Sequence, residues 1–247
     1  MENVKNNNVI ELKNVAKHYV MGDNIVKALN GVNISIQRGD FVAIMGPSGS
    51  GKSTSMNLIG SLDLATEGNI YLDGHDIEYL EESELAQIRG KKIGFIFQQF
   101  NLIPNLTAKE NVMLPMLFQG KDEIERETRA EKLLKLVELG ERMDHYPNQL
   151  SGGQQQRVAI ARSLSNDPEV ILADEPTGNL DTKTGEMIMT FLNNLNNEGK
   201  TIIIVTHNPE LAKEHAKTIY SVKDGNIESV EKKINGKWKK ISNTKDL

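Results

Sequence analysis

Short apolar segments alternate with polar ones along the chain, and their periods predict a mixed α/β protein. Residues 32–36 alternate between apolar and polar side chains, which indicates a strand with one buried face. Residues 41–45, 170–173 and 201–205 are continuously apolar, as strands covered on both faces are. We expect further strands at residues 10–15, 69–72 and 92–97.

Helical segments follow several of these strands and carry their own start and stop signals. After residue 54, apolar side chains form a broad face that extends as far as Leu62. A further helix is expected between Asp181 and Gly199. The pair Asn208-Pro209 predicts the start of another helix, since proline is favoured at the first helical position.

The middle of the chain has helical rather than strand patterns. Thr107 and Glu110 have the spacing of a capping box at a helix start. Residues 121–139 are first charged and then rich in leucine, and Gly140 is the predicted helix stop. We therefore divide the chain into a catalytic core (1–98 and 151–230, with an N-terminal β subdomain), a helical insertion (99–150) and a basic C-terminal tail (231–247).

The C-terminal end combines a hairpin signal with a cluster of lysines. Asp224-Gly225 lies between two strand-like segments and predicts a tight hairpin turn. After Ser229 there are six lysines, two acidic residues and the only tryptophan, Trp238. This tail is open to three interpretations: a solvated tail, an additional hairpin, or a binding patch.

Composition narrows the class of protein. The 247 residues include 29 lysines and arginines against 34 acidic residues, and no cysteine. A net charge of −5 argues against broad nucleic-acid binding, which needs a concentrated basic surface. The missing cysteines exclude disulfides and thiolate metal sites. No segment has the ~20 apolar residues of a membrane span, and residues 1–8 do not resemble a signal peptide, so we expect a cytoplasmic protein.

Residues 46–54 fit the phosphate-loop pattern G-x-x-x-x-G-K-[ST] between a predicted strand and a predicted helix. Its glycines let successive N–H groups point at phosphate oxygens, and the following helix adds its dipole. Lys52 is expected to reach the β- and γ-phosphates, and Ser53 to offer its hydroxyl to Mg²⁺. The residues expected to bind the nucleotide are Gly46, Ser48, Gly49, Ser50, Gly51, Lys52, Ser53 and Thr54.

A second anion-receptive helix start is predicted at Ser151, Gly152 and Gly153. Serine is a good N-cap, and the two glycines let a ligand approach the backbone closely. Taken alone, this pattern favours a capped helix after a flexible loop. Together with the phosphate loop it indicates a turn that reads the nucleotide of another copy, and we infer a head-to-tail homodimer with two shared sites.

The predicted catalytic groups follow buried strands. Asp174 ends one strand and is placed to hold the Mg²⁺ shell, while Glu175 can act as general base toward the attacking water. His207 follows the next strand, where ligands collect in α/β sheets, and we interpret it as a γ-phosphate contact. Gln98 is a candidate contact to Mg²⁺ or to the water, and Tyr19 to adenine. Taken alone, Gln98 is equally an ordinary loop residue, and the position of Tyr19 before a strand is only weak support for its role.

In their order and spacing these motifs resemble the ATP-binding subunits of ABC transporters, over about residues 9–230. The resemblance implies an ABC-type phosphate-loop ATPase fold: a RecA-like core, an antiparallel β subdomain and a helical signature subdomain. The matching features are Tyr19, Walker A at 46–54, Gln98, the signature at 150–154, Walker B at 170–175, the D-loop at 178–181 and His207.

The resemblance also implies roles for individual residues. Tyr19 would stack on adenine, and residues 46–54 would hold the phosphates with Mg²⁺. Gln98 would couple the Mg²⁺ and water site to a membrane partner, and Ser151, Gly152 and Gly153 would close on the ATP of the other subunit. Glu175 would polarise the water and His207 would hold the γ-phosphate.

Four longer stretches, at 44–54, 59–63, 97–104 and 148–157, resemble more closely the lipoprotein-release and macrolide-efflux branch of that family. Ser55, where the branch has an aliphatic residue, and the lysine-rich tail depart from it. The resemblance implies an ATPase peripheral on the inner face of the membrane that drives a separate permease, with export or extraction of cargo as the favoured direction. The apolar run 100–104, next to Gln98, is expected either to line the permease contact or to pack inside the insertion.

Two other functions remain open at this point. A soluble ABC ATPase acting on nucleic acid, ribosomes or cofactor assembly would share every motif. The acidic charge and the absence of a long coiled coil or of a second ATPase half disfavour it. A phosphate-loop kinase would share Walker A but would have no need of the Ser151 turn. Phosphate release without an acceptor substrate separates an ATPase from such a kinase.

Overall fold

A computed structural model describes residues 7–22 and 24–241. The chain divides into two compact units, which are described separately. The first unit contains the residues up to Leu85 and those from Asn196 onward, and the second contains Ala86–Leu195.

The first unit contains an antiparallel sheet ordered β2-β1-β4-β5. Its long hairpin is made by β1 (Asn8–Met21) and β2 (Asn24–Gln37), and β4 (Glu67–Leu72) pairs with the other side of β1. Alternate residues of β2, including Val32, Ile34 and Ile36, are buried, which confirms the strand with one buried face. The remaining elements of this region are β5 (His75–Asp76) and the short helix η1 (Ile77–Tyr79).

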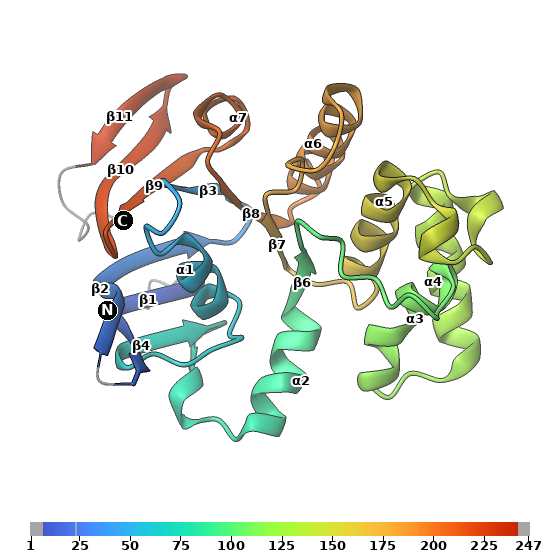
Figure 1. The fold of residues 1–247 in the computed structure, drawn as a ribbon, viewed down its shortest axis with the longest axis horizontal. Helices are drawn as coiled ribbons and strands as arrows, with labels where there is room; N and C mark the ends of the chain where they lie inside the picture. Colours follow the sequence, from blue (N-terminus) through green and yellow to red (C-terminus); the bar gives the residue numbers. More distant parts are fainter. Residues whose placement is uncertain (1–6, 23, 242–247) are drawn as a thin grey trace, which may run out of the picture. The chain divides into compact units, whose positions relative to one another are not determined.

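The other strands of the first unit are ordered β11-β10-β9-β3-β8. The central strand β3 (Phe41–Met45) pairs in parallel with β8 (Thr201–Thr206) and with β9 (Thr218–Lys223). Both β3 and β8 are almost completely buried, as their continuously apolar sequences predict. Helix α1 (Lys52–Ile59) contacts β1, β2 and β8, and α7 (Pro209–His215) contacts β3 and β8 (Figure 1).

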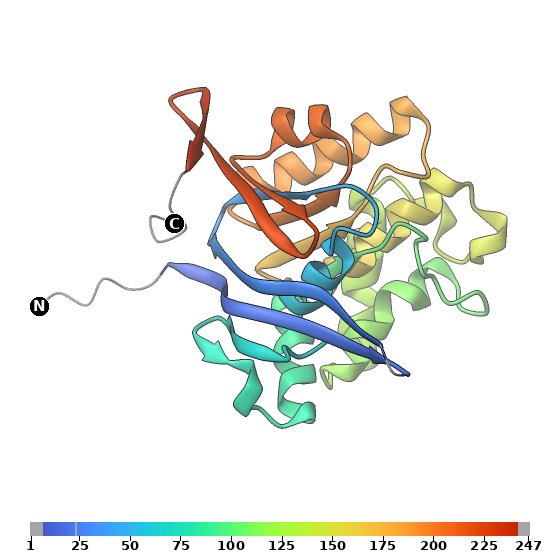
Figure 2. The ribbon, with the colours of Figure 1, turned by 60° about the vertical axis from the view of Figure 1, so that its left-hand side comes forward.

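The lysine-rich tail forms strands as far as it is described. β10 (Asn226–Ile234) pairs with β9 through the predicted turn and also with β11 (Lys237–Ile241), so the described part of the tail is an additional hairpin. Asn235 and Gly236 both have positive φ at its turn, as a two-residue hairpin loop requires. In Figure 2 this hairpin is the red ribbon, and it continues the sheet on the far side of β9 from β3. Residues 242–247 lie outside the described part of the chain, as do residues 1–6 of the predicted polar start.

The second unit contains a parallel strand pair, β6 (Ile93–Ile96) with β7 (Val170–Asp174). Helices α3 (Ala108–Phe118), α4 (Glu123–Leu136) and α5 (Gly152–Ser163) pack on one another, and α5 also contacts β6. Helix α6 (Thr182–Asn197) follows β7, and α2 (Glu82–Lys92) leads into β6. Two short turns, η2 (Gly140–Arg142) and η3 (Pro147–Gln149), lead into α5. The predicted capping box is present: Thr107 N–H donates to the Glu110 carboxylate at 2.7 Å.

Two predicted helix ends are wrong. Helix α1 stops at Ile59, and Leu62 lies beyond it with 42% of its surface exposed, because the backbone leaves the helix at Gly60. Helix α4 stops at Leu136 rather than at Gly140, because Glu138 already has a positive φ of 59°. Among the described residues, none of the helices is long and apolar enough to cross a membrane.

Candidate nucleotide-binding site

The phosphate loop joins β3 to α1 in the first unit. Gly49 and Gly51 have φ of +77° and +104°, values that side-chain-bearing residues rarely adopt. A Cβ on Gly46 would lie 2.2 Å from the carbonyl oxygen of Val222, and a Cβ on Gly51 would lie 2.6 Å from that of Ala28. Close approach of the backbone therefore requires glycine at positions 46 and 51, and Gly51 is required by its positive φ as well.

A pocket of about 410 Å³ opens over this loop. Its floor is formed by loop and α1 residues, including Lys52 and Ser53, and its walls come from β2 and from the hairpin turn Asp224-Gly225. The Gly225 N–H donates to the Ser50 carbonyl at 3.0 Å, which attaches this turn to the loop. The wall residues Val26, Lys27, Ala28, Asp224 and Gly225 were not predicted, because tertiary pairing and no local motif brings them to the loop.

The groups around the pocket fit a nucleoside triphosphate. Lys52 Nζ donates to the Pro47 carbonyl at 2.8 Å, so the ammonium lies across the loop. The Ser50 hydroxyl is buried without a hydrogen-bond partner within the described residues, and the first N–H groups of α1 have no acceptor inside the helix. Among those residues there is no cluster of three His, Asp or Glu. A divalent ion bound at this loop would have the Ser53 hydroxyl, phosphate oxygens and water within its reach, and these are oxygen ligands of the kind that Mg²⁺ uses.

His207 lies beside the start of the phosphate loop. In the parallel pairing of β3 with β8, Met45 is the partner of Thr206. The residues that follow, Gly46 and His207, therefore both leave the carboxyl ends of neighbouring strands. His207 is exposed there, as a residue that contacts a ligand must be.

Tyr19 lies near the end of β1 and is held by charged neighbours. Its partner across the hairpin is Val26, which lines the loop pocket, although Tyr19 itself does not. The Tyr19 hydroxyl donates to Asp63 at 3.2 Å, and Lys17 Nζ lies 5.2 Å from the centre of its ring. Burial opposes ionisation of Asp63, but hydrogen bonds from Lys17, Leu64 and Tyr19 keep the pKa of this carboxyl below its usual range.

In the second unit, Gln98 and Glu175 lie on either side of Gly178. A Cβ built on Gly178 would be 3.2 Å from Gln98 Nε2 and 3.4 Å from Glu175 Cβ. Asp174 ends β7, and Gln98 follows β6, which is parallel to β7, so these side chains leave the same end of the strand pair. Glu175 has a positive φ of 42°, a strained conformation of the kind that concentrates at functional sites.

The signature turn begins α5 in the predicted way. Ser151 accepts a hydrogen bond from the Gln154 N–H at 3.3 Å, and the Gln154 side chain accepts one from the Ser151 N–H at 2.9 Å. A pocket of about 280 Å³ is lined by Ser151, Gly152, Gly153 and the D-loop residues 179–181. The side chain and N–H of Thr184 donate to Asp181 and lower the pKa of its carboxyl.

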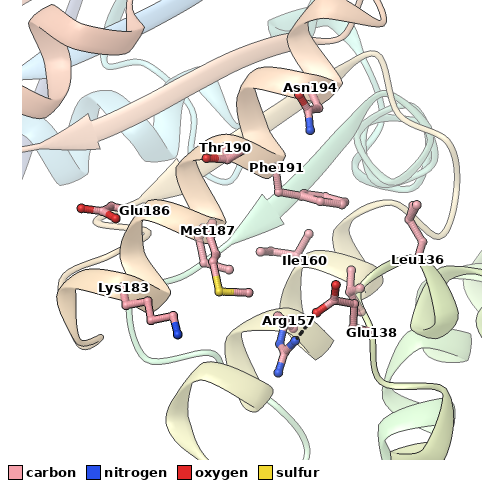
Figure 3. Close-up of a pocket in the computed structure, with 12 residues that line it drawn as sticks. Leu136, Glu138, Arg157, Ile160, Lys183, Glu186, Met187, Thr190, Phe191 and Asn194 are labelled. Atoms are coloured by element: carbon pink, nitrogen blue, oxygen red, sulfur yellow. Dashed lines mark hydrogen bonds and ion pairs between the residues drawn. The ribbon is translucent and has the colours of Figure 1, made fainter.

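A larger pocket, of about 490 Å³, lies beside the signature pocket and contains no predicted site residue. Met187, Ile160 and Phe191 point into it, and Arg157 is paired with Glu138 at its edge (Figure 3). It shares Arg157, Met187 and Ile188 with the signature pocket. We assign no ligand to it.

The phosphate loop, the buried strand β7 that ends in Asp174 and is followed by Glu175, and the second glycine-rich helix start define a phosphate-loop nucleoside triphosphatase. The profile of the family "ABC transporter" matches residues 29–178. An ABC transporter ATP-binding protein of Methanocaldococcus jannaschii, MJ0796, is 57% identical over 91% of this chain and 97% of its own length. The chain therefore belongs to the ABC transporter family, as its ordered motifs predict.

Other relatives and solved structures agree. The ATP-binding protein YknY of Bacillus subtilis is 54% identical over 89% of this chain and 95% of its own length. The macrolide export protein MacB of Bdellovibrio bacteriovorus is 50% identical, but this chain spans only 34% of it. A dimeric structure of MJ0796 with ADP and phosphate has a TM-score of 0.84 at 54% identity and covers 90% of this chain and 98% of the MJ0796 chain. The predicted fold is thus confirmed, and the chain is an ATP-binding and ATP-hydrolysing subunit of an ABC transporter.

Proposed function

We propose that two copies of this chain close head to tail on two Mg-ATP and that hydrolysis reopens them. The observation that carries this proposal is the presence of two anion-receptive helix starts, each with its own pocket. One pocket is lined by the phosphate loop with Lys52, and the other by Ser151–Gly153 with the D-loop. ATP bound between copies stabilises the closed dimer by mass action. MJ0796 forms a dimer in its solved structures, which supports the same arrangement here.

Within each shared site, the residues of this chain have distinct proposed roles. Tyr19 stacks on adenine, and residues 46–54 hold the phosphates, with Lys52 on the β- and γ-oxygens. Ser53, Asp174 and Gln98 hold Mg²⁺ and its water shell. When bound, Mg²⁺ neutralises the charge of the β- and γ-oxygens. Glu175 accepts a proton from the attacking water, His207 binds the γ-phosphate, and Ser151, Gly152 and Gly153 donate to the γ-phosphate held by the other copy.

We also propose that a separate membrane permease uses this motion for export or extraction. The macrolide export proteins among the relatives support an exporting branch. In this arrangement the chain is cytoplasmic and peripheral on the inner face of the membrane. Residues 1–98 and 151–230 act as the catalytic core, 99–150 as the helical insertion and 231–247 as the tail. The segment 100–104 lines the contact with the permease.

A complementation experiment tests the shared site. Ser151→Arg chains keep an intact phosphate loop, and Lys52→Ala chains keep an intact signature turn. Mixed dimers of the two contain one intact composite site, so the mixture should hydrolyse ATP well above either variant alone. Activity of the mixture no higher than that of the separate variants would contradict the head-to-tail dimer.

A pull-down tests the membrane partner. Tagged Glu175→Gln chain should bind Mg-ATP without hydrolysing it and so remain in the closed state. Recovery of a permease from native membranes, identified by mass spectrometry, is the expected result. Recovery of only soluble proteins or ribosomes would contradict the transporter role and favour a soluble ABC ATPase.

A further inference from the structure

Three carbonyl oxygens of the loop after β6 are held by side chains from two other segments of the second unit. The Gln98 carbonyl accepts from Asn179 Nδ2 at 2.8 Å, and Asn179 belongs to the D-loop. The carbonyls of Phe100 and Asn101 both accept from the guanidinium of Arg162, which lies in the last turn of α5. The loop that carries Gln98 is thus attached to two of the elements that line the signature pocket, the D-loop and α5.

The loop is strained where Arg162 holds it. Phe100 and Asn101 have φ of +57° and +50°, so two consecutive residues with side chains occupy the left-handed region. That conformation is unfavourable for Phe100, whereas asparagine tolerates it better, and at Phe100 it persists only when surrounding contacts enforce it. The two hydrogen bonds from Arg162 are such contacts, because the planar guanidinium can donate to two acceptors in a fixed geometry.

Phe100 is hydrogen-bonded to one end of α5 and lies near the other. Its carbonyl is bound by Arg162 in the last turn, at 2.8 Å. Its ring reaches the first turn, where a Cβ on Gly152 would lie 3.7 Å from the end of the ring. Phe100 therefore lies close to the signature turn and is hydrogen-bonded to the other end of the helix.

Arg162 has no carboxylate partner in the described part of the chain, so its charge is directed entirely to main-chain oxygens. Burial lowers the pKa of the guanidinium but leaves it charged at neutral pH. Hydrogen bonds from a charged donor are stronger than those between neutral groups. A partly buried charge whose partners are the carbonyls of two residues with positive φ indicates a positioning role.

We propose that Arg162 is a positioning residue that fixes the signature turn relative to the Gln98–Asn101 loop, so that displacement of this loop moves the turn acting on the other copy's ATP. The inference rests on the proposed shared site. In this proposal, the side chain of Arg162 connects the segment 100–104, which we expect to contact the permease, with the signature turn Ser151–Gly153. A residue that served only the folding of its own chain would affect both halves of the shared site equally.

Mixed dimers separate these two roles. In the mixture of Ser151→Arg with Lys52→Ala chains, the composite site takes its signature turn only from the Lys52→Ala chain. Arg162→Met, which keeps the aliphatic stem and removes the donors, is therefore added to one chain at a time. In the Lys52→Ala chain, Arg162→Met alters the chain that supplies the signature turn of the composite site, which we call the signature position. In the Ser151→Arg chain, it alters the chain that supplies the phosphate loop, which we call the phosphate-loop position.

We expect the ATPase activity to fall at least about tenfold when Arg162→Met is in the signature position, since a displacement of ~1 Å at reacting groups can cost up to ~100-fold. In the phosphate-loop position it should stay within about twofold, because Gln98, which acts there, is still held through its carbonyl by Asn179. That result also shows that the substituted chain folds. The affinity of single chains for a fluorescent ATP analogue should not change, because the phosphate loop is untouched.

Arg129→Met is the matched control. Arg129 also donates to a main-chain carbonyl, that of Leu164 at 3.1 Å, but it touches neither the loop nor the signature turn. It should have no positional effect. Equal losses in both positions, a loss only in the phosphate-loop position, or no loss would overturn the proposed role of Arg162. An inactive parental mixture, without Arg162→Met, would instead overturn the shared site, and the role of Arg162 with it.

Discussion

The hydroxyl of Tyr19 donates a hydrogen bond to Oδ2 of Asp63 at 3.2 Å, while Oδ1 of the same carboxylate binds Lys17 Nζ at 2.6 Å. Lys17 in turn lies near the Tyr19 ring. One carboxylate therefore fixes both the ring and the cation beside it. A ring held in this way loses little conformational freedom when a base stacks on it, which favours binding.

Substitutions at Tyr19 and Asp63 should weaken ATP binding in a graded way. Tyr19→Ala removes the stacking surface and should weaken binding about tenfold, since base–aromatic stacking contributes ~1–3 kcal/mol. Tyr19→Phe keeps the ring and should cost a few-fold at most, and Asp63→Ala should lie between them. Competition against a fluorescent ATP analogue measures these affinities. Tyr79→Ala, at a residue that is 82% exposed, is the control, and wild-type affinity in Tyr19→Ala would refute the stacking role.

Two glycines of the phosphate loop should differ in their tolerance of alanine. Gly46→Ala places a Cβ 2.2 Å from the Val222 carbonyl, so β9 and the loop must separate. Gly49→Ala meets nothing within 4 Å and pays only for its positive φ, roughly 1–2 kcal/mol. Urea denaturation should show a clearly larger loss of unfolding free energy for Gly46→Ala. Equal losses would mean that the loop relaxes away from Val222 at little cost.

Tyr220 should make the protein sensitive to alkali. Burial, opposed in part by the hydrogen bond with Ser35, raises its pKa to about 12 from an ordinary value of 10.0. Above pH 10 the unfolded chain loses this proton while the folded chain keeps it, so stability falls as the pH rises toward 12. Two pKa units correspond to about 2–3 kcal/mol.

The measurement is urea denaturation at neutral pH and near pH 11. Tyr220→Phe should be less stable at neutral pH, because it loses a buried hydrogen bond, but should lose less stability on going to high pH. Tyr79→Phe, at the exposed position, should keep the wild-type pH dependence. If the unfolding free energy of Tyr220→Phe fell with rising pH as steeply as that of the wild type, groups other than Tyr220 would be responsible for the loss.

Leu102→Glu should reduce recovery of the permease while basal ATPase activity remains. Leu102 is half-buried in the segment after Gln98, and a charge there opposes an apolar contact. The measurement is the membrane pull-down together with phosphate release by the isolated chain. Leu136→Glu, at a residue of α4 that is 56% exposed, is the control for an added charge. Loss of ATPase activity together with permease binding would show instead that the segment packs inside the helical insertion.

The sequence predicts the buried strands well because burial on both faces leaves a continuous apolar run. Phe41–Met45 was predicted with its bounds, and β8 differs from its prediction by one residue. Helix ends were harder, because a tertiary contact or a left-handed residue can end a helix before a glycine does. Glu138, just after the end of α4, is such a case. The pair Asn235-Gly236 is a strong hairpin signal that would have decided between a tail and a strand.

The candidate site was predictable where its groups are local in sequence. The phosphate loop and Ser151–Gly153 are contiguous motifs whose chemistry follows from residue type. The pocket wall from Val26 to Ala28 and the attachment of Arg162 to Phe100 join residues far apart in the chain. Sequence spacing carries no record of such contacts, because packing of separate elements creates them.

The hairpin of β10 and β11 leaves β11 as the edge of its sheet, and Lys237, Lys239 and Lys240 lie along that edge. An exposed edge strand is a template on which another chain can add a strand, and lysines oppose this by mutual repulsion. A protein whose cycle depends on repeated, reversible meeting of copies must avoid irreversible meetings. The lysine-rich edge therefore protects the protein against aggregation during storage and at high concentration. Removing its positive charges should favour fibres or precipitates before it changes the rate of ATP hydrolysis.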